Sequence, residues 1–194
     1  MKVIALAGPS GAGKSWACER VAEILHDLRV EVLPLDAYYF GESGGLRPNF
    51  DDPESVDLAL VAEHIAELRA GRSVRRPVYD FCTHTREEIT AEVYPADVLI
   101  VEGIFALHCP TVRVAADVLA YIEERESVCL RRRIVRDERE RGRSYTDALE
   151  RLDAINHGLD TFVAPSKAHA TLVGNAPTVV AGVIRSVLMG GRSL

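Results

Sequence analysis

Eight residues near the start of the chain have the types and the spacing of a phosphate-binding turn. They read GPSGAGKS and fit the pattern G-x-x-x-x-G-K-[ST] at every fixed position. The three glycines permit backbone angles that direct successive N–H groups at phosphate oxygens. The lysine is then placed to reach the β- and γ-phosphates, and the serine to offer its hydroxyl to Mg²⁺. The residues expected to hold a nucleoside triphosphate are Gly8, Ser10, Gly11, Ala12, Gly13, Lys14 and Ser15.

The residues on either side of this turn support the interpretation. An apolar segment, 2–7, precedes the turn, and apolar residues at helical spacing follow it over 15–28. A helix that begins at the turn adds the positive end of its dipole and unpaired N–H groups to the phosphate site. The alternative, a glycine-rich turn with a chance lysine, does not account for this order of strand, turn and helix.

Two carboxylates follow strand-like segments. Asp36 ends VEVLPLD, and Glu102 ends VLIVE. In a doubly wound sheet the carboxyl ends of the strands form the ligand-binding edge, so both side chains are expected beside the phosphates. A carboxylate there can take the proton of an attacking hydroxyl. The alternative for each residue is a helix cap or a loop carboxylate.

The stretch LRRRIVRDERERGR, residues 130–143, holds seven arginines and no lysine in an acidic chain. Planar guanidinium groups suit phosphate, and fixed cations stabilise the charge that spreads over a transferring phosphoryl group. We expect a lid over about 131–156, hinged at Gly142. The alternative is a solvated helix with i,i+4 pairs such as Arg133 with Asp137. The arginines expected on the exposed side are Arg131, Arg132 and Arg139.

Apolar segments that alternate with helical patterns indicate one α/β domain over residues 1–194, with a parallel sheet covered on both faces. Two stretches break the alternation. Residues 74–95 indicate a β-hairpin, and residues 39–53 a long loop rich in Gly, Pro, Asn and Asp. The expected strands are 2–7, 30–35, 98–101, 118–122 and 170–173, and the expected helices are 15–28, 55–70, 131–141 and 145–155.

Composition restricts the partners and the compartment. The net charge of −6 argues against a general nucleic-acid partner. No apolar run approaches the roughly 20 residues that cross a bilayer, so no membrane partner is expected. The four cysteines stand far apart with no C-x-x-C pair, which is typical of reduced thiols in a cytosol. We therefore expect a cytoplasmic protein.

A phosphate-binding turn predicts nucleotide binding and leaves the reaction open. A switch GTPase needs an N-K-x-D-type guanine reader, and the chain contains none. Motor and transport ATPases usually carry two acidic residues at the end of a buried strand, whereas Glu102 is followed by Gly103. Small-molecule kinases are the leading class.

The sequence resembles the uridine kinases (uridine–cytidine kinases), within the phosphoribulokinase-like group of P-loop kinases. The shared stretches, in family order from residue 3 to about 143, are GPSGAGKS, LDAYYF, NFDDPESVD, PVYDFCTHTR, VYPADVLIVEGIFAL and RRRIVRDERERGR. The resemblance implies a P-loop NTPase fold, a five-stranded parallel sheet flanked by helices, with a small β-hairpin insertion and an arginine-rich lid. It also implies transfer of the γ-phosphoryl group of ATP or GTP, with Mg²⁺, to the 5′-hydroxyl of uridine or cytidine, a step of pyrimidine salvage.

The resemblance also implies residue roles. Asp36 is similar to the family's catalytic base, and Asp51 in NFDDP to the carboxylate that holds the ribose hydroxyls. Tyr79 and His84 resemble the pair that contacts the pyrimidine from the hairpin, and Glu102 resembles the carboxylate near Mg²⁺, where Ser15 is also expected. The expected catalytic residues are Asp36, Lys14, Arg133 and Arg136, the expected donor-binding arginine is Arg141, and the expected acceptor-binding arginines are Arg133 and Arg143.

Alternatives remain open at the acceptor. From the residues alone, His84 also fits a surface histidine, and Tyr79 a packing tyrosine. A kinase that acts on a sugar phosphate or pantothenate is the second interpretation, and a nucleotide-binding regulator without catalysis is the third. The hairpin favours a flat base, which a ring can stack on and a histidine can hydrogen-bond. Family members commonly form tetramers, so the resemblance implies a homo-oligomer, although the stretch around 156–173 is shorter than in the family.

Overall fold

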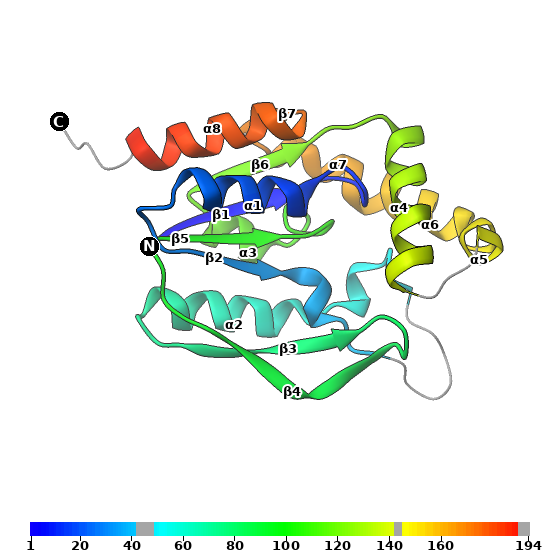
Figure 1. The fold of residues 1–194 in the computed structure, drawn as a ribbon, viewed down its shortest axis with the longest axis horizontal. Helices are drawn as coiled ribbons and strands as arrows, with labels where there is room; N and C mark the ends of the chain where they lie inside the picture. The colour runs from blue at the N-terminus through cyan, green and yellow to red at the C-terminus, as the bar shows by residue number, and fades with distance from the viewer. Residues whose placement is uncertain (42–48, 142–144, 190–194) are drawn as a thin grey trace.

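The computed structural model describes residues 1–41, 49–141 and 145–189, and its centre is a five-stranded parallel sheet between two layers of helices (Figure 1). The strands lie in the order β2-β5-β1-β6-β7. The predicted fold class is confirmed, although the last strand starts at Leu172 rather than at 170. The strand bounds are β1 Lys2–Ala7, β2 Val30–Pro34, β5 Val98–Glu102, β6 Val118–Ile122 and β7 Leu172–Gly174.

The strand β1 is apolar from Val3 to Ala7 because both faces of the sheet are buried at this strand. Ile4 and Leu6 join the core on one face of the sheet, and Val3 and Ala5 join the core on the other. Among the strands that the structure describes, the edge strand β2 pairs with β5 alone. Pro34 is tolerated in β2 because a strand at the edge needs no N–H on its outer side.

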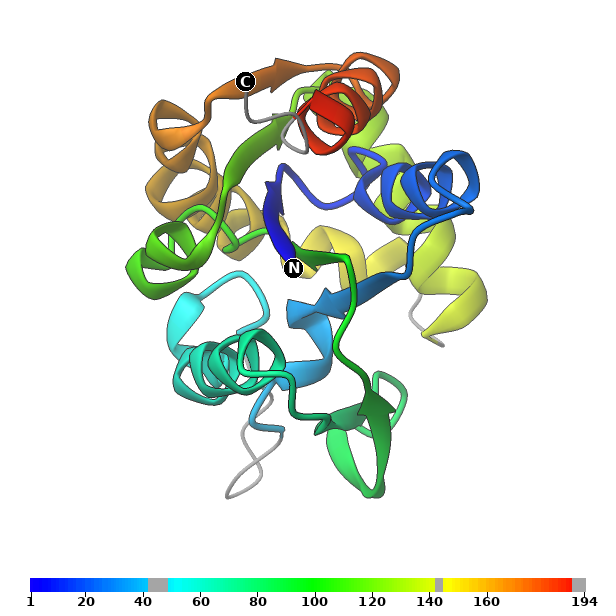
Figure 2. The same ribbon diagram turned by 90° about the vertical axis from the view of Figure 1, so that its left-hand side faces the viewer.

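Helices α1 (Lys14–Ile24) and α8 (Ala176–Met189) cover one face of the sheet, and α2 (Leu58–Arg69) and α3 (Pro110–Ala115) cover the other (Figure 2). The sequence patterns predict no helix over α3 or α8. The β-branched residues and Gly182 of α8 lower its helix propensity, and packing overrides that preference. A Cβ at Gly182 would come within 2.6 Å of a methyl group of Leu172, so the glycine permits close contact between α8 and β7.

The first two predicted helices are shorter in the structure than the sequence patterns predict. α1 ends at Ile24 rather than at 28, and α2 begins at Leu58 rather than at 55. A 3₁₀ turn, η2 (Pro53–Ser55), precedes α2, and the carboxylate of Asp57 caps α2 by accepting from the Leu60 N–H at 3.1 Å.

The predicted hairpin is present and lies beside α2, outside the sheet (Figure 1). Its strands, β3 (Val74–Asp80) and β4 (Thr85–Val93), pair antiparallel. The hairpin contacts η1 (Leu35–Tyr38), the 3₁₀ turn that follows β2. Arg86 fixes this contact, because its guanidinium donates to the carbonyl oxygens of Tyr38 and Tyr39, each at 2.7 Å.

Short helices gather beyond the carboxyl ends of the strands (Figure 1). The arginine-rich helix α4 (Glu126–Glu140) begins at Glu126 rather than at 131, and the helix predicted over 145–155 is divided into α5 and α6. Gly142 and Arg143, the predicted hinge and acceptor-side arginine, lie outside the described residues. The remaining elements are α5 (Tyr145–Glu150), α6 (Leu152–Gly158), η3 (Leu159–Val163), α7 (Ala164–Ser166) and η4 (Lys167–His169).

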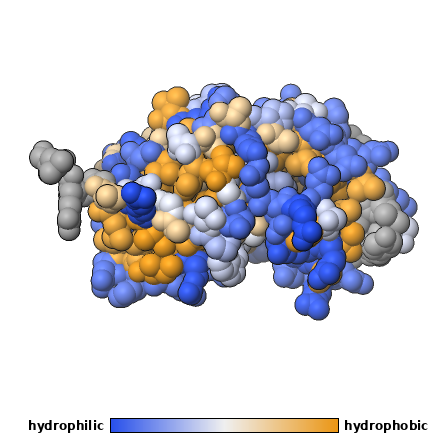
Figure 3. Space-filling view, turned by 90° about the horizontal axis from the view of Figure 1, so that it is seen from above, coloured by the Kyte–Doolittle hydropathy of each residue, from blue (hydrophilic) through white to orange (hydrophobic). Residues whose placement is uncertain are grey.

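Within the described ranges, no helix combines the length and the apolar character that a membrane span requires. Exposed apolar side chains occur at the ends of α1 and α8, where Ile24, Leu188 and Met189 are 44%, 59% and 62% exposed. Figure 3 shows apolar surface toward the end of α8 that is remote from α4. This surface therefore lies away from the carboxyl edge of the sheet.

Candidate active site

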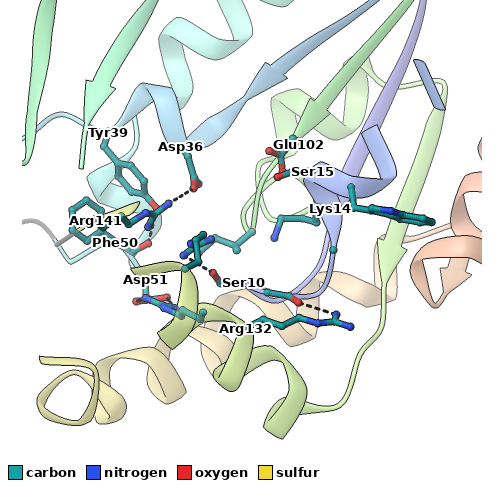
Figure 4. A pocket seen from close by; sticks show the side chains of 16 residues that line it. Ser10, Lys14, Ser15, Asp36, Tyr39, Phe50, Asp51, Glu102, Arg132 and Arg141 are labelled. Carbon is teal, nitrogen blue, oxygen red and sulfur yellow. Dashed lines mark hydrogen bonds and ion pairs between the residues drawn. The ribbon is translucent and has the colours of Figure 1, made fainter. Parts of the chain in front are cut away.

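The phosphate-binding turn joins β1 to α1 at the carboxyl edge of the sheet (Figure 4). Gly8, Gly11 and Gly13 have φ angles of 146°, 85° and 99°. A Cβ on Gly8 would lie 2.6 Å from the carbonyl oxygen of Ile122, and one on Gly11 would lie 2.4 Å from that of Cys129. The glycines are required both by the turn and by the close approach of β6 and α4 to it.

Lys14 is the buried cation of the turn. Its amino group donates to the carbonyl oxygens of Gly8 and Pro9, each at 3.0 Å. Burial lowers the pKa of Lys14, and the nearby charges of Glu102 and Asp36 oppose that shift. A phosphate anion in the turn would further oppose this lowering of the Lys14 pKa and so favour the protonated amine. The amino group of Lys14 therefore lies within the turn, against the carbonyl oxygens of its first two residues.

Glu102 ends β5, and its carboxylate lies beside the side chain of Ser15 (Figure 4). Burial raises the pKa of Glu102 to about 7, and the charge of Lys14 opposes the shift. Hydroxyl and carboxylate oxygens suit Mg²⁺, which completes its octahedron with waters and substrate phosphates. In the part of the chain that the structure describes, no three His, Cys, Asp or Glu side chains form a metal site by themselves. The residues present therefore fit Mg²⁺ that is bound jointly with a triphosphate.

Asp36 lies in η1, directly after β2, at the same edge as Glu102. Its carboxylate is 41% exposed and faces Arg141, with 3.5 Å between Oδ2 and Nη2 (Figure 4). Asp36, Glu102 and Lys14 line one cavity of about 260 Å³. The structure thus brings the two predicted carboxylates together, because β2 and β5 are neighbours in the sheet.

Asp51 and Arg133 form a buried ion pair across 82 residues of sequence. Both guanidinium Nη atoms donate to the carboxylate, each at 2.8 Å, and each side chain is 11% exposed. Gly158 of α6 packs on the backbone of Asp51 so closely that a Cβ would lie 2.2 Å from the Asp51 carbonyl oxygen. The pair lines the same cavity as Asp36, so the structure brings two of the predicted acceptor-side residues to this site.

Three further arginines reach the cavity from α4 and the residue that follows it. The Nη2 atom of Arg136 lies 3.4 Å from the hydroxyl of Ser10. Arg132, predicted on the exposed side, is 51% exposed, yet it donates to the carbonyl oxygen of Gly11 at 3.2 Å. Arg141 pairs with Asp36, and burial lowers the pKa of Arg141. All three arginines predicted on the exposed side, Arg131, Arg132 and Arg139, are exposed.

The hairpin side chains are buried in an aromatic cluster, defined here as Tyr39, Phe50, Tyr79, Phe81 and His84. The ring centre of Tyr79 lies 4.9 Å from that of Phe81 and 5.6 Å from that of Tyr39. His84 lies 5.4 Å from Phe50 and is 7% exposed, so it is not the surface histidine that its sequence also allows. Tyr39 and Phe50 line the cavity, whereas Tyr79 and His84 lie behind them.

Tyr39 and Phe50 line the cavity, although neither is among the residues predicted from the sequence for the site. Their ring centres are 4.8 Å apart, and the Tyr39 hydroxyl donates to the Phe50 carbonyl oxygen at 2.7 Å. A signal for both was present, because LDAYYF places Tyr39 three residues after Asp36 and NFDDP places Phe50 directly before Asp51. Arg141 also covers the cluster, with its Cζ atom 3.8 Å from the ring centre of Phe81.

Two neighbouring cavities adjoin the site. One of about 360 Å³ lies between α4 and α6 and has Asp51 and Arg133 in its wall. The other, of about 530 Å³, is lined by Trp16, Arg132 and Pro177, on the α8 side of the phosphate turn. Trp16 is 47% exposed and also lines the 260 Å³ cavity. An indole and a guanidinium beside a phosphate turn suit a flat nucleotide base.

Positive charge predominates at the site, although the chain carries a net charge of −6. The cavity can therefore bind a triphosphate, hold a hydroxyl beside Asp36 and stabilise a transferring phosphoryl group. Its charged lining consists of Lys14, Arg132, Arg133, Arg136 and Arg141 against Asp36, Asp51 and Glu102.

Comparison with known proteins identifies relatives over most of the chain. The sequence model of the phosphoribulokinase/uridine kinase family matches residues 3–180. A uridine kinase of Staphylococcus aureus (strain Newman) is 35% identical over 179 residues, which cover 88% of this chain and 86% of that protein. A putative fructose transport system kinase from Silicibacter sp. TM1040 superposes with a TM-score of 0.68 at 24% identity, covering 89% of this chain and 88% of that one. A possible uridine kinase from Bacillus stearothermophilus gives a TM-score of 0.62 at 20% identity, with 90% and 88% covered.

Proposed function

The chain belongs to the phosphoribulokinase/uridine kinase family and is an ATP-dependent phosphotransferase that acts on an alcohol, and we propose that this alcohol is the 5′-hydroxyl of uridine or cytidine, as in pyrimidine salvage. The observation that carries the proposal is the presence in one cavity of Asp36, the Asp51–Arg133 pair, and the rings of Tyr39 and Phe50. A nucleoside offers one group to each of these: a primary hydroxyl, a vicinal diol and a flat base.

Asp51 can bind the ribose diol without losing Arg133. Each carboxylate oxygen has two lone pairs, so Asp51 can accept one guanidinium N–H and one ribose hydroxyl at each oxygen. Arg133 holds the carboxylate in a fixed plane, which orients the diol and through it the 5′-hydroxyl. Tyr39 and Phe50 supply the apolar wall for the base, and we propose that Tyr79 and His84 complete the base site from behind Phe50.

In the transfer step, the 5′-oxygen attacks the γ-phosphorus while its proton passes to Asp36. The bond from the γ-phosphorus to the β–γ bridging oxygen breaks, which yields a nucleoside 5′-monophosphate and ADP. Lys14 and Arg136 lie where they can stabilise the charge on the moving group. Mg²⁺ held by Ser15 and Glu102 would neutralise charge on the phosphates. The proposed roles of the remaining arginines are donor contact for Arg141 and acceptor contact for Arg143.

An acceptor panel tests this proposal. ADP formation is measured with uridine, cytidine, ribulose 5-phosphate, pantothenate and fructose, with ATP and GTP as alternative donors. We expect turnover with uridine or cytidine, and we expect 5′-deoxyuridine, which lacks the reacting hydroxyl, to inhibit competitively without turnover. Turnover only with an alcohol other than a nucleoside would overturn the proposed acceptor, although the protein would still be a kinase. Triphosphate binding without turnover on any acceptor would favour the regulator.

A pair of phenylalanine variants tests the base site. Phe50→Ala should lower kcat/KM for the nucleoside by about tenfold or more, since stacking on an aromatic ring contributes about 1–3 kcal/mol per base. Phe40→Ala is the matched control, because Phe40 is 57% exposed and does not line the cavity. Equal kcat/KM values for the two variants would show that Phe50 does not contact the acceptor.

A further inference from the structure

Asp137 is a buried carboxylate among the arginines of α4. It is 6% exposed and lies one turn from Arg133 and from Arg141 along the helix, with Arg136 directly before it. Its Oδ1 atom accepts from Nε and Nη2 of Arg136 at 3.1 and 2.8 Å and lies 3.6 Å from Nη1 of Arg141. Its Oδ2 atom lies 3.9 Å from Nε of Arg133. One carboxylate therefore contacts three of the cations that line the cavity.

Helix geometry accounts for only part of this arrangement. Residues four positions apart lie on one face, so the approach of Arg133 and Arg141 to Asp137 follows from their spacing. Adjacent residues point in different directions, so the Arg136 side chain has to turn back along the helix to reach Asp137. The result is that the Arg136 guanidinium is directed at the phosphate turn, where it lies 3.4 Å from the Ser10 hydroxyl.

The three guanidinium groups repel one another, and each carries a long side chain with several rotamers. Without a buried counter-charge they would separate, and ordering them for the transition state would cost side-chain entropy. A carboxylate that accepts from Arg136 and attracts the other two fixes their separation before the substrates bind. Misplacement of a charge-stabilising group by about 1 Å can cost about a hundredfold in rate.

We propose that Asp137 is a positioning residue that sets the spacing of Arg133, Arg136 and Arg141 around the transferring phosphoryl group. Asp137 does not line the 260 Å³ cavity, so it acts through the arginines rather than on the substrates. The proposal rests on phosphoryl transfer and not on the identity of the acceptor.

The test compares Asp137→Asn with Glu138→Gln, which removes the same charge from the next, exposed position of the helix. We expect Asp137→Asn to lower kcat by about tenfold to a hundredfold. Inorganic tripolyphosphate, titrated by calorimetry, should bind to it with wild-type stoichiometry and no loss of affinity, because the arginines remain and one negative charge is gone. Glu138→Gln should match the wild type. A wild-type kcat in Asp137→Asn would overturn the proposal, and so would a loss of tripolyphosphate affinity as large as the loss of kcat.

Two more variants separate positioning from folding. Asp137→Glu keeps the charge but moves it by one methylene, so it remains informative if the Asn variant fails to fold. A lowered kcat with wild-type tripolyphosphate affinity is expected, and a wild-type kcat would overturn the claim that spacing matters.

In the Arg136→Ala background, Asp137→Glu should lower kcat much less than it does in the wild type, because the two residues act as a unit. Fully additive losses would overturn the proposal. The tripolyphosphate measurement needs no acceptor, so its failure is distinct from a wrong acceptor assignment.

Discussion

The substitution Asp51→Asn, which breaks the pair with Arg133, should lower both the stability of the protein and its binding of the acceptor. The amide keeps one acceptor oxygen, but its NH₂ group faces a guanidinium N–H, so one of the two 2.8 Å hydrogen bonds is lost. Hydrogen bonds to charged groups contribute about 1.5–3 kcal/mol, and breaking a fully buried pair costs about 3–5 kcal/mol. Asp137, 3.9 Å from Arg133, compensates part of the unpaired charge.

We therefore expect the free energy of unfolding to fall by about 2–3 kcal/mol, which lowers the melting temperature by roughly 4–12 °C for a chain of this size. Circular dichroism during thermal and urea unfolding measures this change. Glu54→Gln is the control, because Glu54 is an exposed carboxylate near the same loop and should change stability by about 0.5 kcal/mol at most. In the kinase assay, Asp51→Asn should lower kcat/KM for the nucleoside about tenfold to a hundredfold and leave tripolyphosphate affinity unchanged.

A second measurement isolates the origin of the effect. If the loss comes from leaving Arg133 buried without its partner, then adding Arg133→Met to Asp51→Leu should recover part of the stability that Asp51→Leu alone loses. The reasoning would be refuted if Asp51→Asn unfolded at the wild-type midpoint with the wild-type urea dependence. It would also be refuted if the double variant lost as much stability as Asp51→Leu and Arg133→Met lose separately, added together.

Three other predictions follow from the same geometry. Asp36→Asn should lower kcat by about a hundredfold or more with tripolyphosphate binding intact, and wild-type turnover would exclude Asp36 as the base. The pKa of Glu102 is about 7 against an ordinary 4.5, so the stability that Glu102 contributes is complete below pH 4.5 and is lost as the pH rises through 7. Melting temperatures of the protein without metal should therefore decline less over this interval in Glu102→Gln, and an equal decline would contradict the burial argument. Gly11→Ala should abolish tripolyphosphate binding, since its Cβ would lie 2.4 Å from the Cys129 carbonyl oxygen, whereas Gly71→Ala, also at positive φ but with no atom within 4 Å, should bind as the wild type does. Wild-type tripolyphosphate binding by Gly11→Ala would contradict the close-approach argument, and an equal loss of binding in Gly71→Ala would assign the effect to strain at positive φ instead.

The local chemistry of the site could be predicted from the sequence because it is encoded over short distances. The phosphate turn spans eight consecutive residues, and its strand and helix are adjacent to it. Asp36 and Glu102 could be predicted at one edge because every parallel strand of a doubly wound sheet ends there. The hairpin could be predicted because alternation around a polar turn is also a local pattern.

Features that depend on distant contacts could not be predicted in this way. α8 forms against a propensity that favours other structures, because β7 and α1 supply its packing surface. The sequence pattern places Arg132 and Asp137 on a solvated helix. In the folded chain α4 packs against the phosphate turn, so Arg132 contacts the turn and Asp137 is buried. Asp51 and Arg133 are 82 residues apart, and no spacing rule links them. The types of the charged groups are thus determined by the sequence, whereas their pairing and burial are determined by which distant surfaces the folded chain brings into contact.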